Sequence, residues 1–360
     1  MAGAVALHGP AHAAPLRATA ARCGCRSRAP ARRSVAVLAV DPKYKMVEAF
    51  APATVANLGP GYDWLGCAVQ GQGDFVTARV VPDKPGELFI EAIEGDGGRL
   101  SKDVDANCAG IAARECLKLM GGASCGVALT VKKGMPLGSG LGSSAASAAA
   151  GAQAVNALFG DPLTRDQLVY AGLQSEATVS GYHADNIAPA VWGGFVLVRS
   201  ADPLELVELP YGSQELCFVL VNPKYECPTA EMRAALGDTV PQKDWIANSS
   251  AGGMLVAGIL KGDAMMIGEA LDSDVVVEPV RGNFIPGFFA VKKAAKAAGA
   301  YGCTISGAGP TCVAVVPNEQ VAEEVRDAMC AAFVNEGGLE VNIALITKLD
   351  SEGAVTRVAS

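Results

Sequence analysis

The first residues whose types and spacing suggest chemistry form a glycine- and serine-rich stretch between an apolar, strand-like run and an alanine-rich, helix-like run. The stretch reads Pro136-Leu137-Gly138-Ser139-Gly140-Leu141-Gly142-Ser143-Ser144-Ala145-Ala146-Ser147. Its three glycines at alternate positions lack the Cβ atoms that would keep a polyanion away from backbone N–H groups, and the first amides of the following helix point to the same spot. The pattern predicts a phosphate-binding loop; a flexible loop before a buried helix is the alternative.

Other glycine- or serine-based sites fit this stretch less well. A Walker A loop requires a lysine after its last glycine, and the dinucleotide fingerprint would require a glycine at position 143, where the chain has serine. A serine hydrolase is disfavoured because Ser143 and Ser144 lie outside any G-x-S-x-G turn and His183 is the only histidine after residue 40.

Apolar, β-rich runs predict ten strands, and the runs between them predict seven helices that would position this loop. The expected strands cover residues 47–51, 75–81, 88–93, 127–131, 195–198, 204–209, 217–221, 302–305, 312–315 and 341–346. The expected helices cover residues 106–120, 143–159, 164–179, 230–236, 244–260, 288–298 and 320–335. This mixed order favours an α+β fold, and the length allows two domains, 41–205 and 206–360.

Composition restricts the classes of partner. The chain has 360 residues, of which 50% are hydrophobic and 18% charged, and its formal net charge is −8. A chain with this charge repels phosphate backbones, so no nucleic-acid partner is expected. No run approaches the roughly 18 strongly apolar residues that a spanning helix needs, so no membrane partner is expected either.

The charge is unevenly distributed. Residues 1–40 contain six arginines and no acidic residue, which leaves −14 for the body from Asp41 on. A segment rich in Ala, Arg and Ser and poor in acids is typical of an organelle transit peptide; a disordered basic tail is the alternative. Composition does not distinguish a chloroplast transit peptide from a mitochondrial one. We expect the chloroplast stroma ahead of the mitochondrion.

Cysteine usage indicates a reducing compartment. Of the 11 cysteines, Cys23 and Cys25 lie in the basic segment and nine are scattered through the body without a C-x-x-C pair. We therefore expect small core residues rather than a disulfide framework or a zinc site.

Three ordered motifs, which include the loop at 136–147, resemble those of the GHMP kinases. The other two are Pro52-Ala53-Thr54-Val55-Ala56-Asn57-Leu58-Gly59-Pro60-Gly61-Tyr62-Asp63 and Thr304-Ile305-Ser306-Gly307-Ala308-Gly309-Pro310-Thr311. The resemblance extends over the body from about Val47. It implies the two-domain GHMP kinase fold, with an N-terminal domain like ribosomal protein S5 domain 2 and a C-terminal ferredoxin-like α/β sandwich, and it implies ATP and Mg²⁺.

Residues 56–63 and the stretch Gly181-Tyr182-His183-Ala184-Asp185-Asn186 resemble the branch of this family that acts on L-homoserine. The resemblance implies ATP-dependent phosphorylation of the homoserine side-chain hydroxyl to O-phospho-L-homoserine, on the route to threonine, by a homodimer. Tyr62 stands where the family often has phenylalanine. Another hydroxylated metabolite as substrate and a catalytically silent ATP-binding protein are the alternatives.

The resemblance also implies roles for single residues. Ser144 and Glu176 would hold Mg²⁺. These two residues, together with Asp185 and Asn186, are the implied catalytic residues. ATP would bind to the loop at 136–147, with Asn107 beside the adenine and with Gly307 and Gly309 near the phosphates. The substrate-binding residues implied are Asn57, Asp63, His183, Asn186, Thr229, Arg233 and Arg281.

Burial statistics alone would place Glu176 and the two arginines on the surface, and they favour solvated strand-end charges for Lys132 and Lys133. The forked guanidinium groups of Arg233 and Arg281 suit a carboxylate, and Asp63 suits an ammonium group. Whether Asp185 acts as a base or Asn186 merely orients the hydroxyl stays open, so Asp185→Asn is expected to slow turnover moderately.

Overall fold

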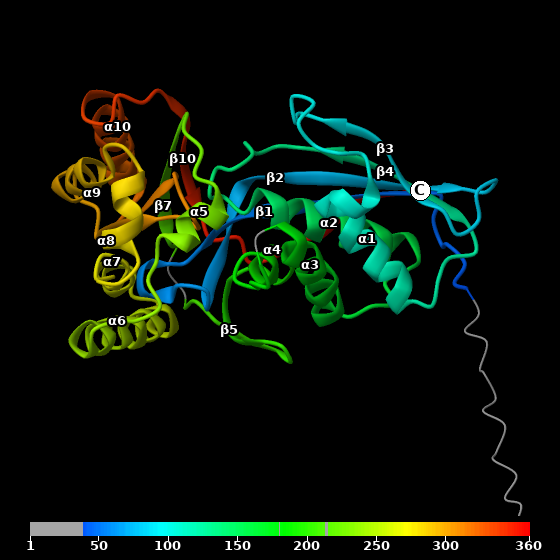
Figure 1. The fold of residues 1–360 in the computed structure, drawn as a ribbon, viewed down its shortest axis with the longest axis horizontal. Helices are drawn as coiled ribbons and strands as arrows, with labels where there is room; N and C mark the ends of the chain where they lie inside the picture. Colours follow the sequence, from blue (N-terminus) through cyan, green and yellow to red (C-terminus); the bar gives the residue numbers. More distant parts are fainter. Residues whose placement is uncertain (1–38, 180, 213–214) are drawn as a thin grey trace, which may run out of the picture. The chain divides into compact units, whose positions relative to one another are not determined.

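The computed structural model describes residues 39–179, 181–212 and 215–360 (Figure 1). The transit peptide expected over residues 1–40 lies outside the described residues, except for its last two. The described body forms one compact unit from residue 39 on. Strands and helices occur in mixed order through this unit, so the α+β fold class is confirmed.

The first sheet has seven strands in the order β11-β1-β2-β4-β3, with β5 paired to β2 and β6 paired to β5. Their bounds are β1 Met46–Ala56, β2 Leu65–Val81, β3 Leu88–Glu94, β4 Gly126–Lys132, β5 Phe195–Ala201, β6 Leu204–Leu209 and β11 Val355–Ala359. The β1–β2 pair is antiparallel and long, running from Met46 opposite Arg79 to Ala56 opposite Gly66. The chain between these strands forms the tight turn that carries Asn57 and Asp63.

Four helices accompany this sheet: α1 Cys108–Leu119, α2 Ser143–Leu158, α3 Arg165–Val179 and α4 Ile187–Trp192. Helix α2 packs directly on β1 and β2, and the other three pack around α2 (Figure 1). Nearly every residue of α2 is buried. Its alanines are small enough to let the sheet and the neighbouring helices approach from several sides, which explains an alanine-rich helix at the centre of the core.

The second sheet has four antiparallel strands in the order β10-β7-β9-β8. These strands are β7 Cys217–Pro223, β8 Gly302–Ile305, β9 Cys312–Val316 and β10 Val341–Lys348. The helices of this half are α5 Thr229–Ala234, α6 Gln242–Lys261, α7 Ala264–Leu271, α8 Glu278–Arg281, α9 Phe288–Ala297 and α10 Glu319–Asn335. Side chains of α9 and α10, including Phe288, Val291, Met329 and Phe333, form a second core against this sheet.

Each of the ten expected strands and seven expected helices has a counterpart in the structure, with shifted ends. The sequence analysis missed α4, α7, α8, β11 and the first half of β2. The first half of β2 contains glycines, which disfavour a strand by propensity. A Cβ on Gly66 would lie 1.9 Å from the carbonyl oxygen of Asp185, so glycine there marks a close backbone approach rather than a break.

Two features cross the domain boundary expected after residue 205. Strand β6 spans that position, and β11 returns from the end of the chain to pair with β1 in the first sheet. All nine body cysteines are free, and seven of them are buried, as the sequence predicts. Within the part of the chain that the structure describes, no helix is long and apolar enough to cross a bilayer.

Candidate active site

The loop before α2 requires its three glycines for conformation and for space. Gly138, Gly140 and Gly142 have φ values of +65°, +79° and +66°, in the left-handed region that other residues rarely adopt. A Cβ on Gly142 would lie 1.9 Å from Thr54 Oγ1, and one on Gly140 would lie 2.5 Å from the carbonyl oxygen of Ser306. The loop is therefore packed in a fixed shape.

The N-terminus of α2 presents open donors. Gly142 occupies the N-cap and offers no side-chain cap, so the first N–H groups of the helix have no intrahelical acceptor. The hydroxyl of Ser143 is buried without a hydrogen-bond partner in the described part of the chain, and Ser144 is partly exposed beside it. Free amides at a helix N-terminus suit an anion.

The loop at 306–311 clamps the glycine-rich loop before α2. The carbonyl oxygen of Ser139 accepts hydrogen bonds from Thr311 Oγ1 (2.5 Å) and Asn222 Nδ2 (3.3 Å). The carbonyl oxygen of Gly140 accepts one from Ser306 Oγ (2.7 Å). The expected phosphate-proximal residues Gly307 and Gly309 are part of this clamp, so two motifs far apart in sequence meet at the start of α2.

The prediction of a solvated charge was wrong for Lys133. Its side chain is buried, forms an ion pair with Asp74 on β2 and donates to the Ser143 carbonyl oxygen and the Ser147 hydroxyl, both at 2.8 Å. Asp74 also accepts from Ser147 Oγ (2.6 Å). Neighbouring strand residues face opposite sides, so Lys132 is exposed while Lys133 points inward. The sequence analysis missed Asp74 because it is 59 positions away from Lys133.

The expected ammonium-binding residue Asp63 is paired with Arg233. The Arg233 Nη1 and Nη2 atoms donate to Asp63 Oδ2 and Oδ1, both at 2.8 Å. Asn57 orients this turn, because its Oδ1 accepts from the Asp63 N–H (2.8 Å) and its Nδ2 donates to the Gly307 carbonyl oxygen (2.9 Å). His183 Nδ1 lies 3.8 Å from Asp63 Oδ1. Burial lowers the pKa of His183, although the Asp63 carboxylate opposes this shift.

Arg281 is only 1% exposed, which overrides the surface position favoured by burial statistics. It donates to the carbonyl oxygens of Met232 (3.2 Å) and Gly307 (3.3 Å) and to Tyr62 Oη (3.3 Å). The centre of the Tyr62 ring lies 4.7 Å from the guanidinium carbon of Arg281 and 5.3 Å from that of Arg233. The sequence analysis noted Tyr62 only as a departure from the family pattern and did not predict that it contacts both arginines.

Asp185 and Asn186 are close to both the loop before α2 and Asp63: a Cβ on Gly142 would lie 2.9 Å from Asn186 Oδ1, and the Asp63 charge acts on Asp185. Asp185 is 2% exposed, and burial, with a smaller effect of the Asp63 charge, raises its pKa to about 7. The Glu176 charge contributes to the same shift, so Glu176, itself buried on α3, is close. Asn186 Oδ1 accepts from Thr54 Oγ1 (2.8 Å), and the sequence analysis did not single out Thr54.

Two expected residues are placed less centrally. Thr229 is exposed at the start of α5, one turn before Arg233. Asn107 is the N-cap of α1: its Oδ1 accepts from the N–H groups of Ala109 and Gly110, and its Nδ2 donates to the Ser101 carbonyl oxygen. The Oδ1 atom of Asn107 therefore caps α1, and its Nδ2 atom joins the preceding loop to the start of the helix.

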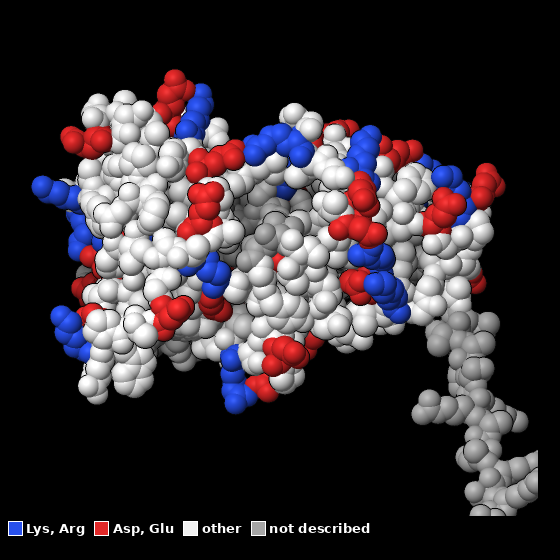
Figure 2. All heavy atoms as spheres, viewed as in Figure 1, with Lys and Arg blue, Asp and Glu red and all other residues white. Residues whose placement is uncertain are grey.

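Figure 2 shows a hollow in this face of the molecule, over the region where α2, α4 and α5 are labelled in Figure 1. Lysine, arginine, aspartate and glutamate side chains gather around its rim (Figure 2). Such a site can bind a polyphosphate at the start of α2 and a small charged molecule near Asp63 and the two arginines.

Comparisons with known proteins agree with this arrangement. The family model for the GHMP kinases N terminal domain matches residues 107–194, and the model for the GHMP kinases C terminal domain matches residues 255–335. A homoserine kinase of Arabidopsis thaliana is 55% identical over 331 residues, covering 91% of this chain and 89% of that protein. A homoserine kinase of Chloroherpeton thalassium is 41% identical, covering 83% of this chain and 96% of that protein.

Solved structures give the same result. The crystal structure of a homoserine kinase from Cytophaga hutchinsonii superposes with a TM-score of 0.81 at 39% identity, covering 88% of this chain and 98% of that one. The similarity spans both sheets and the helices that carry the site.

Proposed function

Since the chain belongs to the GHMP kinase family, among its homoserine kinases, we propose the residue roles by which it transfers phosphate from ATP to homoserine. The reaction is ATP-dependent phosphorylation of the side-chain hydroxyl of L-homoserine to O-phospho-L-homoserine, a step of threonine biosynthesis. Phosphoryl transfer depends on positioning and charge neutralisation more than on covalent chemistry. The site must therefore hold a triphosphate and an amino acid side by side.

One observation supports this proposal most strongly: the 306–311 loop contacts both halves of the site. Ser306 Oγ donates to the phosphate loop at Gly140, while the Gly307 carbonyl oxygen accepts from Asn57 and from Arg281. The nucleotide phosphates would bind the free amides at the start of α2, with Gly138 to Gly142 giving them access to the backbone. Homoserine would bind on the other side of the same clamp.

Homoserine carries a carboxylate and an ammonium group. The buried guanidinium of Arg281 and the guanidinium of Arg233 would bind the carboxylate, and Asp63 would receive the ammonium group. Asp63 and Arg233 form an ion pair with each other, and homoserine would replace this pair with an Arg233–carboxylate contact and an Asp63–ammonium contact. His183, whose Nδ1 lies 3.8 Å from Asp63 Oδ1, would line the pocket. Thr229, one helical turn before Arg233, would face it from the start of α5.

Mg²⁺ would be held by the hydroxyl of Ser144 and the carboxylate of Glu176. These are hard oxygen donors from two adjacent helices, and Mg²⁺ commonly uses one or two protein oxygens with phosphates and water. Bound there, Mg²⁺ would neutralise phosphate charge.

Glu176→Gln should raise the Mg²⁺ concentration needed for half-maximal activity, measured by magnesium titration against wild type.

The reacting hydroxyl must lose a proton, and Asp185 is the candidate acceptor. Its raised pKa means that the carboxyl is partly protonated near neutral pH and ionises above about 7. Asn186, fixed by Thr54, would orient the hydroxyl. A loose transition state needs little help from a base.

Asp185→Asn is expected to lower kcat by no more than about 10²-fold. Wild-type kcat/KM should rise as pH increases through about 7, and the variant should lack this rise.

Because the pKa of Asp185 in the folded state lies above its unfolded value, the ionised carboxylate lowers the stability of the folded protein, and this cost grows from about pH 4 to 7. The variant should therefore melt at a higher temperature than wild type at pH 8 but not at pH 4. Asp83→Asn, in an exposed turn, is the control, and a rise with pH that persists in the Asp185→Asn variant would assign it to another group.

The activity is tested by ADP release with homoserine, mevalonate, galactose and shikimate as acceptors. We expect turnover with homoserine and at least about 10⁴-fold lower kcat/KM with the acceptors that lack an α-amino acid group. Turnover restricted to another acceptor would contradict the choice of substrate. Nucleotide binding without turnover of any acceptor would indicate a silent ATP-binding protein.

Two further proposals concern the cell rather than the site. The basic, acid-poor residues 1–40 support import into the chloroplast stroma, with the mitochondrion as second choice, and import assays with both isolated organelles test this. A homodimer is proposed by resemblance to the family, and light scattering of the purified protein tests it.

A further inference from the structure

Arg281 is the last residue of α8, a helix of four residues. A helix this short forms few internal hydrogen bonds and cannot fix its own position. The guanidinium of Arg281 makes three hydrogen bonds of its own, and the position of its backbone depends on side chains that anchor α8 from outside.

The start of α8 is anchored by Asp274. This residue is 6% exposed, and its carboxylate accepts hydrogen bonds from the N–H groups of Val276 (2.9 Å), Val277 (3.1 Å) and Glu278 (2.8 Å). Three backbone donors on one carboxylate fix the path by which the chain enters the helix.

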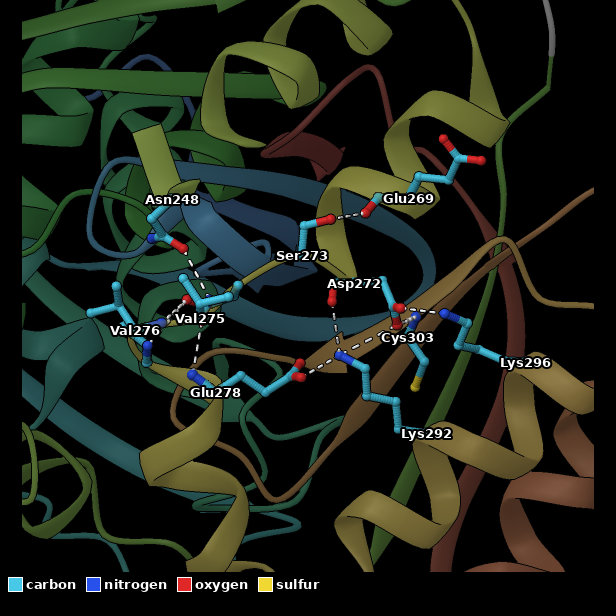
Figure 3. Close-up of polar contacts among 12 residues, drawn as sticks. Asn248, Glu269, Asp272, Ser273, Val275, Val276, Glu278, Lys292, Lys296 and Cys303 are labelled. Atoms are coloured by element: carbon cyan, nitrogen blue, oxygen red, sulfur yellow. Dashed lines mark hydrogen bonds and ion pairs between the residues drawn. The ribbon is translucent and has the colours of Figure 1, made fainter. Parts of the chain in front are cut away.

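The second anchor is an ion pair between Glu278, the first residue of α8, and Lys292 on α9. Glu278 is 6% exposed, and burial raises its pKa while the Lys292 charge opposes that shift. The Lys292 ammonium also lies 3.3 Å from the Asp272 carboxylate and donates to the Asp272 carbonyl oxygen (3.3 Å). Figure 3 shows Lys292 between Asp272 and Glu278, so this one lysine joins the end of α7 and the start of α8 to α9.

Lys296 provides a built-in comparison. It lies one turn after Lys292 on the same helix, and it forms an ion pair with the Asp272 carboxylate (Figure 3). Its side chain is 49% exposed, against 16% for Lys292. It has no contact with Glu278 in the described structure, so it shares the charge and the partner of Lys292 but not the link to α8.

We propose that Lys292 and Glu278 are positioning residues for homoserine binding, because their buried ion pair holds α8 where Arg281 meets the substrate carboxylate. This inference rests on the proposed role of Arg281. Neither side chain needs to touch the substrate. Their removal would leave Arg281 in the chain but let its helix shift, and a small misplacement of a binding group is enough to weaken recognition.

The test compares steady-state kinetics of full-length wild type with those of Lys292→Met, Lys292→Arg, Glu278→Gln and Lys296→Met. For Lys292→Met and Glu278→Gln we expect the KM for homoserine to rise about tenfold, with the KM for ATP and kcat within about twofold of wild type. Lys292→Arg retains the charge and should recover most of the homoserine affinity. Lys296→Met should match wild type in all three constants.

A loss of stability alone would lower the apparent kcat and leave both KM values unchanged, and a general disturbance of the site would raise the KM for homoserine and for ATP together; either result would overturn the inference. An unchanged KM for homoserine in Lys292→Met, or an equal rise in Lys296→Met, would also overturn it. If Lys292→Met does not fold, Glu278→Gln carries the same comparison, since it removes charge while preserving shape. Failure of the proposed function is separate, because wild type would then release no ADP with homoserine.

Discussion

Replacing Gly142 by alanine is expected to abolish nucleotide binding and with it the kinase activity. The added Cβ would lie 1.9 Å from Thr54 Oγ1 and 2.9 Å from Asn186 Oδ1, and the residue has a φ of +66°. Relief of this clash requires the loop to move away from the start of α2, Asn186 to move, or both. We expect kcat/KM for ATP to fall at least about 10²-fold.

The matched control is Gly86→Ala. Gly86 has a φ of +76°, but a Cβ added there meets no atom within 4 Å, so this variant carries the same kind of backbone strain without the collision. Nucleotide affinity by calorimetry and melting temperature should be measured for both variants. Nucleotide binding by a folded Gly142→Ala variant at wild-type affinity would contradict the assignment of this loop.

Replacing Arg281 by methionine is expected to raise the KM for homoserine about 10²- to 10³-fold, the range found for loss of a buried charge partner. Methionine fills much of the same space, while the three hydrogen bonds to Met232, Gly307 and Tyr62 disappear. Lysine should not substitute well, because it cannot reproduce the fork of the guanidinium. The KM for ATP should change little, since the phosphate loop is held by other residues.

Arg79→Met is the control for this second variant, because Arg79 is an exposed arginine that pairs with Glu91 on the first sheet. Homoserine affinity is best measured by calorimetry as well as kinetics, with melting temperature as the check on folding. A folded Arg281→Met enzyme with unchanged homoserine affinity would show that the carboxylate binds elsewhere.

Much of the fold could be predicted because local pattern and local structure coincide. The strands β7 and β9 are continuous apolar runs, and the phosphate loop combines glycines with a helix start. The elements that were missed depend on distant contacts or are very short. The strand β11 owes its existence to pairing with β1. An exception is α7, whose N-cap Asp263 accepts from the Met266 N–H, a capping signal that the sequence does contain.

The family and the glycine-rich loop before a helix could be predicted from the order of amino acids, because glycine spacing acts through backbone geometry within a few residues. The same order supplied the candidate substrate residues, but not their partners. Folding of the whole chain paired Asp63 with Arg233 across 170 positions, brought the Tyr62 ring against two guanidinium groups and buried Lys133 beside Asp74. These pairings depend on which surfaces the two sheets and their helices bring together. Burying a charge without a partner costs free energy, so a side chain of opposite charge or a hydrogen-bonding group must lie beside each buried charge.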